Sequence, residues 1–276
     1  MLQKTNFHTH TRYCDGRNTT EEMIQDAISK KFAALGFSGH SYTSYDTRYC
    51  MAENSIKQYQ NEIRILQKKY AEQIRIFCGI EQDFYAESGT DGFDYVIGSV
   101  HAIFQNGAYH TIDVSKEETA YIIKDVFGGD FIKCTKCYFE TVAQVVKKTN
   151  ADIIGHFDLI TKFYEKNPLL EHKRYRFEAQ TAMEHLLQFE KPFEINTGAM
   201  YRGLRTEPYP AVWLLKELHK QGGRVILSSD SHDTNSLGYG FEMVLSMIQE
   251  IGFREICIWT KNGLQEVDIT HKKVFL

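Results

Sequence analysis

The 276-residue sequence predicts one α/β domain, most simply a parallel barrel of the TIM type. Short runs rich in β-branched and aromatic residues alternate with amphipathic helical patterns along the whole chain. Histidine and acidic residues also recur at the ends of the β-rich runs, where barrels of this type place their active sites. We therefore treat residues 1–276 as a single domain, since barrels of about 250 residues commonly form one unit.

The first half of the sequence predicts four strands and two helices. The strands are predicted at residues 3–8, 33–40, 73–81 and 95–101. Thr19 and Glu22 form a capping-box pattern, which predicts a helix over residues 19–31. One apolar helical face predicts the second helix, and it consists of Ile56, Tyr59, Ile63, Leu66 and Tyr70.

The second half continues the same alternation and completes about seven or eight βα units. Its strands are predicted at residues 152–156, 193–196, 224–229 and 255–259. Ser115 and Glu118 predict the start of one helix. Further helices are predicted around residues 139–146, at 173–189, from Pro210 to the Gly222-Gly223 pair, and at 242–251. Proline fits a first helical turn, and glycine fits a helix end.

Composition excludes several classes of protein. A formal net charge of −4 argues against a nucleic-acid binder that uses a basic surface. No apolar run of about 18 residues and no leader-like start are visible, so we expect a cytoplasmic protein without membrane contact. The six cysteines are expected to be free thiols, and the lone Cys134-x-x-Cys137 pair is interpreted as incidental spacing.

Nine residues at or just beyond the ends of the predicted strands are candidate metal ligands. They are His8, His10, Asp15, His40, Glu81, His101, His156, Asp230 and His232. Side chains alternate along a strand, so His8 and His10 point the same way, as do Asp230 and His232. Imidazole and carboxylate groups suit zinc, manganese and iron. The sequence therefore predicts a site for several metal ions.

This ordered set of residues resembles the polymerase and histidinol phosphatase (PHP) family of metal-dependent phosphoesterases, and most closely its monofunctional histidinol-phosphatase branch. The resemblance spans the whole chain. It is carried by Phe7-His8-Thr9-His10 with Asp15, Gly39-His40, Gly79-Ile80-Glu81, Gly98-Ser99-Val100-His101, Gly155-His156 and Ser229-Asp230-Ser231-His232. The resemblance implies a distorted (β/α)7 TIM-like barrel with three divalent ions, either zinc, manganese or iron.

The resemblance also implies how the nine residues divide among the ions. One ion is expected between His8, His10, Glu81 and Asp230. Glu81 would bridge to a second ion, held by His101 and His156. The third ion would be held by Asp15, His40 and His232.

The chemistry of phosphate esters favours the same interpretation. A phosphate monoester dianion repels hydroxide, so its hydrolysis requires a nucleophile at neutral pH and positive charge on the phosphoryl oxygens. We expect a hydroxide that bridges the ions linked by Glu81 to be the nucleophile. Asp15 or His232 is the candidate for proton transfer.

The resemblance to the histidinol-phosphatase branch implies L-histidinol phosphate as the substrate, hydrolysed to L-histidinol and phosphate in histidine biosynthesis. Arg202 and Arg205 are candidate phosphate contacts, although surface ion pairs would explain them equally well. Asn196 and Asp158 are candidate contacts for the ammonium and imidazole groups. The tyrosines of the loops at residues 41–53 and 102–114 are interpreted as packing at the rim of the barrel.

Three alternatives stay open from the sequence. A PHP-type phosphoesterase could act on phosphotyrosine, a nucleotide or a DNA end. An amidohydrolase-type enzyme also begins with a His-x-His strand and ends with a strand-end aspartate. A non-catalytic metal-binding module is the third alternative. The expected partner is a small phosphomonoester, and monomer and homodimer both remain possible.

Overall fold

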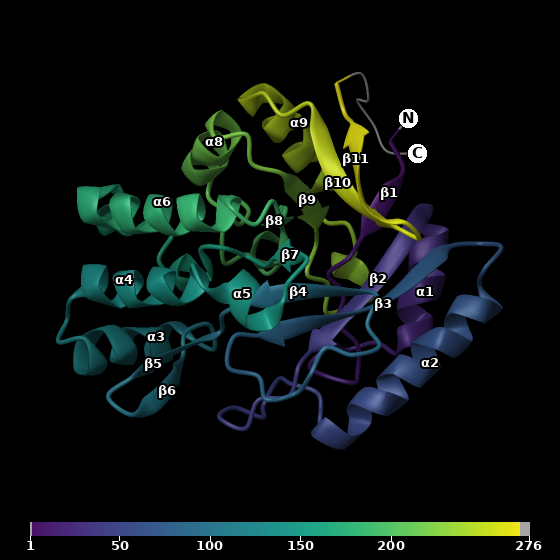
Figure 1. Cartoon of the computed structure of the whole chain (residues 1–276), viewed down its shortest axis with the longest axis horizontal. Coiled ribbons are helices and arrows are strands. Elements are labelled where there is room, and N and C mark those ends of the chain that lie inside the picture. Colours follow the sequence, from purple (N-terminus) through teal and green to yellow (C-terminus); the bar gives the residue numbers. More distant parts are fainter. Residues whose placement is uncertain (1, 271–276) are drawn as a thin grey trace.

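The computed structural model describes residues 2–270, which form a parallel barrel surrounded by helices (Figure 1). The main sheet has the strand order β1-β2-β3-β4-β7-β8-β9-β10-β11. Its first seven strands are parallel and form the barrel, and they are β1 (Lys4–Asn6), β2 (Phe32–His40), β3 (Arg75–Asp83), β4 (Tyr95–Ser99), β7 (Ile153–Ile154), β8 (Phe193–Asn196) and β9 (Val225–Ser228). The antiparallel hairpin of β10 (Glu255–Thr260) and β11 (Gly263–Asp268) extends from β9.

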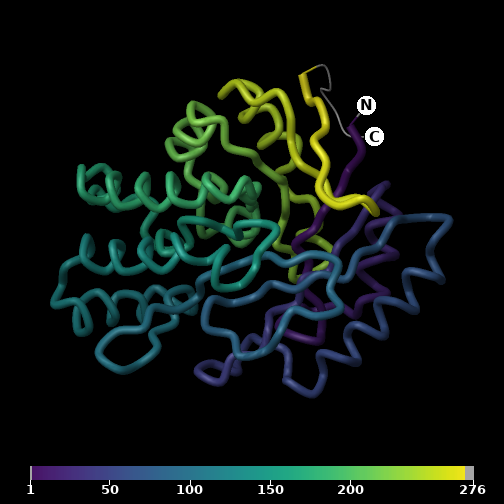
Figure 2. The backbone as a smooth tube through the Cα atoms, in the orientation of Figure 1, coloured from purple at the N-terminus to yellow at the C-terminus, as the bar shows by residue number. Residues whose placement is uncertain are grey.

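The helices lie outside the barrel and connect successive strands. They are α1 (Thr20–Ser29), α2 (Ile56–Lys69), α3 (Lys116–Tyr121), α4 (Phe131–Val142), α5 (Val145–Thr149), α6 (Lys173–Leu187), α7 (Gly198–Tyr201), α8 (Val212–Lys220) and α9 (Phe241–Ile251). The connection from β3 to β4 has no helix, which contributes to the distortion of the barrel. The tube in Figure 2 follows this path from purple to yellow around the barrel.

The barrel closes where its first and last strands meet. Beyond the ends of β1 and β9, Thr9 and Ser231 form a parallel bridge. The amide of His10 donates to the carbonyl of Ser231 at 2.8 Å, and the amide of Ser231 donates to the carbonyl of His8 at 3.1 Å. This contact, which we call the seam, places the His8-Thr9-His10 segment directly beside the Asp230-Ser231-His232 segment.

Tyr95 occupies the interior of the barrel. Its hydroxyl lies 2.6 Å from the carbonyl oxygen of Phe7 and 3.1 Å from that of Phe37, so it links two neighbouring strand segments. Gly36 and Gly79 make room for the ring, because a Cβ atom at either position would lie 2.3 Å from atoms of Tyr95. The small interior cluster is completed by Phe7, Ala34, Phe77, Ile97, Ile153, Ile226 and Cys257.

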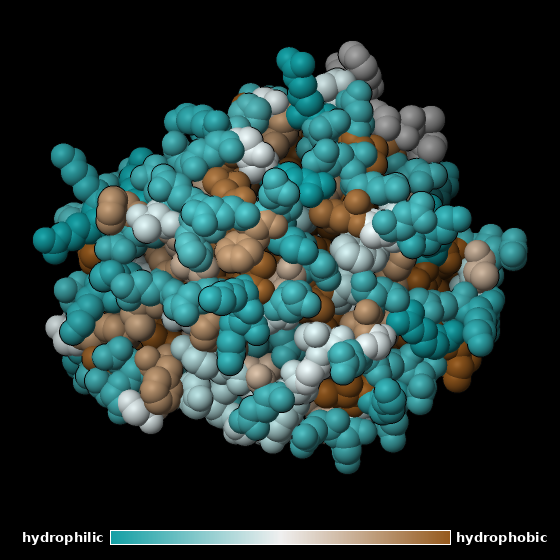
Figure 3. Space-filling view, viewed as in Figure 1, coloured by the Kyte–Doolittle hydropathy of each residue, from teal (hydrophilic) through white to brown (hydrophobic). Residues whose placement is uncertain are grey.

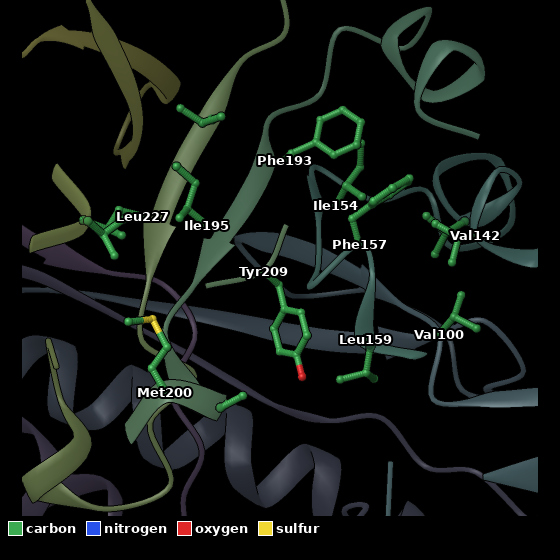
Figure 4. Close-up of a cluster of buried hydrophobic side chains, with 14 of the residues drawn as sticks. Val100, Val142, Ile154, Phe157, Leu159, Phe193, Ile195, Met200, Tyr209 and Leu227 are labelled. Atoms are coloured by element: carbon green, nitrogen blue, oxygen red, sulfur yellow. The ribbon is translucent and has the colours of Figure 1, made fainter. Parts of the chain in front are cut away.

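A larger hydrophobic core lies between the barrel and its helices. Figure 4 shows part of this core around β7 and β8, where Phe157 and Phe193 lie together. Their ring centroids are 5.5 Å apart in an edge-on arrangement. Tyr209 lies between this core and the end of the barrel that carries the polar cluster, with its ring 6.3 Å from that of His156.

The predicted elements agree with the structure, with three corrections. The helix predicted around residues 139–146 is divided between α4, which ends at Val142, and α5, which begins at Val145. The eight predicted strands are present, and the capping box of Thr19 and Glu22 is formed at the start of α1. The segment 102–114, predicted as a loop, contains an antiparallel hairpin of β5 (Ala102–Gln105) and β6 (Ala108–Thr111). Pro210 precedes α8, which begins at Val212, so the prediction that it lies within the first turn was wrong.

The surface shows no large apolar face in the view of Figure 3, where hydrophobic areas are small and separated by hydrophilic side chains. Within residues 2–270, no helix is both long enough and apolar enough to cross a membrane. All six cysteines, including Cys134 and Cys137 on α4, are free thiols, as the sequence predicted.

Candidate metal centre

The structure brings all nine predicted ligand residues together at the carboxyl ends of the barrel strands. His40 is the last residue of β2, and Glu81 lies near the end of β3. His101 and His156 each follow their strand by two residues. The seam supplies the His8-Thr9-His10 and Asp230-Ser231-His232 segments.

Glu81 lies at the centre of the cluster and is 1% exposed. Its Oε1 atom is 2.8 Å from Nε2 of His156 and 3.3 Å from Nε2 of His101. Its Oε2 atom is 2.8 Å from Nδ1 of His40 and 3.1 Å from Nε2 of His8. The two oxygens of one carboxylate therefore face different sets of histidines, which is the arrangement that a bridging ligand requires.

Two further groups flank Glu81. The first consists of His8, His10 and Asp230, with Nε2 of His10 at 3.2 Å from Oδ1 of Asp230. The second consists of His10, Asp15, His40 and His232, with Nε2 of His232 at 3.2 Å from Oδ2 of Asp15. The donor atoms within each group lie within 4.8 Å of one another. A third group contains His40, Glu81 and His101.

These groups differ in one respect from the division that the family resemblance implied. His40 was expected only beside Asp15 and His232, but its Nδ1 atom faces Glu81 while its Nε2 atom lies 3.7 Å from Oδ1 of Asp15. His10 likewise belongs to two of the groups. The cluster is therefore continuous, and His10 and His40 connect its parts.

The backbone at Asp230 is constrained in a way that points to function. Its φ angle is 46°, in the left-handed region that non-glycine residues seldom adopt. The common direction of Asp230 and His232 was predicted from the alternation of side chains along a strand. This reason does not apply, because β9 ends at Ser228 and both residues lie beyond it. Gly198 lies directly against Asp230, and a Cβ atom at this position would lie 2.8 Å from Oδ2 of Asp230.

Two buried carboxylates that the sequence analysis missed hold ligand histidines in place. Oε1 of Glu194, on β8, lies 2.5 Å from Nδ1 of His8, and Oε2 accepts a hydrogen bond from the amide of His156. Oδ2 of Asp83, on β3, lies 3.1 Å from Nδ1 of His101. Such contacts fix the orientation of the ring and leave Nε2 free for a metal ion.

Burial and charge have opposing effects on the histidines. Burial disfavours the imidazolium form of His8, but Glu194 and Glu81 outweigh it and raise the pKa of His8 well above 6.5. Glu81 and Asp83 likewise overcome burial and raise the pKa of His101. Burial together with the neighbouring histidines lowers the pKa of His10 to about 3. The pKa values of these buried histidines are therefore shifted in opposite directions.

The donor set fits divalent metal ions. Nε2 of His8, Nε2 of His10 and Oε2 of Glu81 are buried and have no hydrogen-bond partner among residues 2–270. A buried polar atom without a partner costs about 1–3 kcal/mol. All three atoms face the centre of the cluster, where metal ions would satisfy them. The cluster can therefore bind several metal ions.

A cavity of about 360 Å³ opens above the cluster. Six of the nine predicted ligands, Asp230 among them, line its floor, while Arg17, Arg48, Lys162 and Arg202 bring positive charge to its walls. Tyr49 also lines the cavity, with its ring centroid 4.9 Å from that of His40, so it belongs to the pocket as well as to the rim. The cavity has the charge and the size for a small anionic ligand.

The predicted substrate contacts divide into two sets. Arg202 lines the cavity, and its Nη2 atom donates to Oδ2 of Asp230 at 3.2 Å. Arg205 is only 1% exposed in its side chain and lies beneath the cavity among Asp158, Glu165 and Glu207. Its guanidinium also lies over the ring of Tyr209. Arg205 is therefore held by internal contacts and does not line the cavity, so its contact with phosphate stays a prediction.

Asn196 and Asp158 are both fully buried and do not line the cavity. Nδ2 of Asn196 donates to Oε2 of Glu194, so Asn196 supports the cluster from behind. Oδ2 of Asp158 accepts from the amide of Ala211. Both residues are thus used in internal hydrogen bonds, and their contact with substrate stays a prediction.

The fold and the site together define a metal-dependent barrel hydrolase. The sequence model of the PHP domain family matches residues 6–198, so the chain belongs to this family.

Curated relatives and a solved structure agree with this assignment. The chain is 27% identical to the Schizosaccharomyces pombe protein named "Probable histidinol-phosphatase", over 97% of this chain and 94% of that protein. It is 23% identical to the Bacillus subtilis "Histidinol-phosphatase", over 88% of this chain and 99% of that protein. A histidinol phosphate phosphatase from Lactococcus lactis, solved with zinc, L-histidinol and phosphate, has the same fold, with a TM-score of 0.74, 21% identity and coverage of 96% of this chain and all of that one.

Proposed function

We propose that this protein is a metal-dependent phosphomonoesterase that hydrolyses L-histidinol phosphate to L-histidinol and inorganic phosphate, as a step of histidine biosynthesis in the cytoplasm. The buried cluster of histidines and carboxylates at the floor of a cationic cavity carries this proposal. The names of the relatives support the substrate. We further propose that residues 1–276 act as one domain, as a monomer or homodimer without a nucleic-acid partner.

The nine predicted residues are the proposed metal ligands. Glu81 would bridge two ions, because its two oxygens face different histidines. Zinc, manganese and iron all suit this set of imidazole and carboxylate donors. Divalent ions bound there would bring the pKa of a coordinated water to about 7 and offset the charge that develops on the phosphoryl oxygens.

The other residues of the cavity bind and orient the substrate in this proposal. Arg202 binds a phosphate oxygen, since only its Nη2 atom is used by Asp230 within the described part of the chain. Asp15 and His232 line the cavity and lie 3.2 Å apart. They are proposed to transfer a proton to the leaving alcohol, because both are reachable from the cavity and coupled to each other.

A panel of phosphate monoesters that includes L-histidinol phosphate tests this proposal. The protein is assayed with manganese, zinc or iron and with a chelated control. We expect metal-dependent release of phosphate and the highest kcat/KM for L-histidinol phosphate. Asp230→Ala and His101→Ala are each expected to lower kcat by more than about 100-fold and leave the circular dichroism spectrum unchanged. His185→Ala, on the exposed surface of α6, is the matched control.

The same panel separates the alternatives. Preference for a phosphotyrosine peptide, a nucleotide or a DNA end would support the metal-dependent phosphoesterase activity but contradict L-histidinol phosphate as the substrate. Hydrolysis of amides or lactones would indicate an amidohydrolase-type enzyme. Full metal occupancy without turnover of any ester would indicate a non-catalytic metal-binding module and contradict the proposal.

A further inference from the structure

Asp113 reaches the cavity from the hairpin that follows His101. The chain leaves His101 along β5 and returns along β6, and the amide of Ile112 then donates to the carbonyl of His101 at 2.9 Å. This contact holds Asp113 beside the cluster, where it lines the cavity. Its side chain is 21% exposed.

Lys162 fixes the orientation of Asp113. Nζ of Lys162 donates to the carbonyl oxygen of Asp113 at 2.8 Å and to its Oδ2 atom at 3.3 Å. Oδ1 of Asp113 has no hydrogen bond to any other residue in the range 2–270. A carboxylate can accept about four hydrogen bonds, so Asp113 keeps most of its capacity for a ligand in the cavity.

Asp113 is the acidic residue of the cavity that the metal cluster does not use. The cavity is lined by three acids, and the other two, Asp15 and Asp230, belong to the proposed ligand set. Burial opposes ionisation of Asp113, but Lys162 and the histidines of the cluster outweigh it and lower its pKa. Asp113 therefore presents a negative charge in a cavity whose walls are otherwise cationic.

The proposed substrate carries a cation close to its phosphate. In L-histidinol phosphate, a two-carbon link joins the ester oxygen to the ammonium group. When the phosphate lies on the cluster, the ammonium group must therefore find its partner within a few ångströms, at the edge of the cluster. Asp113 lines the same cavity as His40, His101 and His156, which places it at this edge.

We propose that Asp113 binds the ammonium group of the substrate and thereby selects phosphate esters of amino alcohols over uncharged ones. This inference rests on the proposed function. Arg202 and the cluster take the phosphate, and Asp113 takes the cation on the other side of the ester. The β5–β6 hairpin positions Asp113, which directly follows it, beside the cluster.

The test compares L-histidinol phosphate with 3-(imidazol-4-yl)propyl phosphate, which has the same ring and phosphate but no amino group. We expect the wild-type protein to prefer the amine by at least about 10-fold in kcat/KM, as loss of a charge-assisted contact predicts. Asp113→Asn should lower kcat/KM for the amine by about 10- to 100-fold, mainly through KM, and change the other ester by less than about threefold. Asp113→Glu should retain part of the preference.

Glu118→Gln is the matched control, because it removes one negative charge near the cavity mouth without altering its lining. Glu118 contacts Arg48 from α3 and is 45% exposed. This variant should keep the wild-type preference. The metal content of every variant is measured, so that a disturbed cluster is recognised.

Three results would overturn the role of Asp113: an equal loss for both esters, no loss for either, or a wild-type protein without preference for the amine. If the wild-type protein hydrolyses neither ester above the chelated control, the proposed function fails instead. In that case, calorimetry measures the affinity of the manganese-loaded protein for L-histidinol and for imidazole propanol. This comparison tests whether Asp113 binds the ammonium group, independently of hydrolysis. Equal affinities for the two alcohols, or equal affinities of wild type and Asp113→Asn for L-histidinol, would reject it.

Discussion

Glu194 is the residue whose effect on the metal centre can be tested most directly. Replacing it by glutamine keeps the size of the side chain but weakens the contact with Nδ1 of His8. We expect Glu194→Gln to lower metal affinity or kcat by about 10- to 100-fold, as is usual for residues that orient a ligand histidine. Metal retained after dialysis against buffers of defined free zinc measures the affinity independently of activity.

The control for this experiment is Glu250→Gln, which alters an exposed acid on α9 far from the cluster. It should retain the metal content and the kcat of the wild-type protein. Unchanged metal affinity and unchanged kcat in Glu194→Gln would show that His8 does not depend on this carboxylate.

Metal affinity should rise with pH. Neighbouring carboxylates raise the pKa values of His8, His101 and His232 above 6.5, so these rings keep their protons to a higher pH than a free imidazole does. Each must lose a proton before it can bind a metal ion. Affinity is therefore expected to fall as the pH drops from 8 to 6, and binding should release protons. Calorimetry in two buffers of different ionisation enthalpy counts these protons, and a pH-independent affinity without proton release would contradict the prediction.

At the scale of single residues, the sequence predicted the nine residues of the cluster but not the carboxylates that support them. The nine could be predicted because histidine and acid residues at strand ends are easily recognised. Glu194 lies inside the strand Phe193–Asn196, where strand-end reasoning does not reach. Its signal was a charged residue between the apolar Phe193 and Ile195 of a barrel strand, where a buried charge requires a partner. The ion pair of Arg205 and Asp158, with 3.9 Å between Nη2 and Oδ2, could not be predicted, because it joins residues from distant parts of the sequence.

Among the elements, the short helix α7 makes a tight contact with the cluster through its first residue. A methyl group at Gly198 would lie 2.8 Å from Oδ2 of Asp230 and 3.0 Å from Nη2 of Arg202. We expect Gly198→Ala to displace both side chains, to cost about 1–3 kcal/mol of stability and to reduce kcat by at least about 10-fold. Urea unfolding and phosphate release measure the two effects.

Gly89→Ala provides the comparison, because no atom lies within 4 Å of a Cβ at this position. It should behave like the wild-type protein in both measurements. A fully active and stable Gly198→Ala protein would mean that α7 can move away from Asp230 without cost.

The sequence predicted the regular elements better than the insertion between β4 and α3. Helices and barrel strands follow from periodicity and capping, as the match of α1 and β2 with the predicted ranges shows. The β5–β6 hairpin has only two residues, Asn106 and Gly107, at its turn, and both adopt positive φ angles. An Asn-Gly turn favours such a hairpin, so the signal was present and was not used.

For the whole molecule, metal ions should contribute to stability. The cluster places buried charged and polar groups at one end of the barrel, where metal ions would bind them. A ligand that binds only the folded state stabilises that state by about 4 kcal/mol when its concentration is 1,000 times its Kd. Chelation is therefore expected to lower Tm by about 10 °C, and added manganese should restore it. Differential scanning calorimetry measures the change. An unaltered Tm after complete removal of metal, verified by elemental analysis, would contradict this prediction.

The barrel itself could be predicted from the alternation of strands and helices, together with the position of polar residues at strand ends. Its distortion could not, since the absence of a helix between β3 and β4 and the outward hairpin of β10 and β11 depend on packing between distant segments. The interior contact of Tyr95 with Trp259, whose ring centroids lie 5.6 Å apart, is one such interaction.

The seam between Thr9 and Ser231 has a consequence for the newborn polypeptide. During translation the amino-terminal histidines leave the ribosome more than two hundred residues before Asp230 and His232. No growing chain that stops short of these residues can close the barrel or complete the cluster. The complete set of metal ligands therefore forms only after residues 230 and 232 have been synthesised, whereas the amino-terminal histidines are present in the growing chain long before.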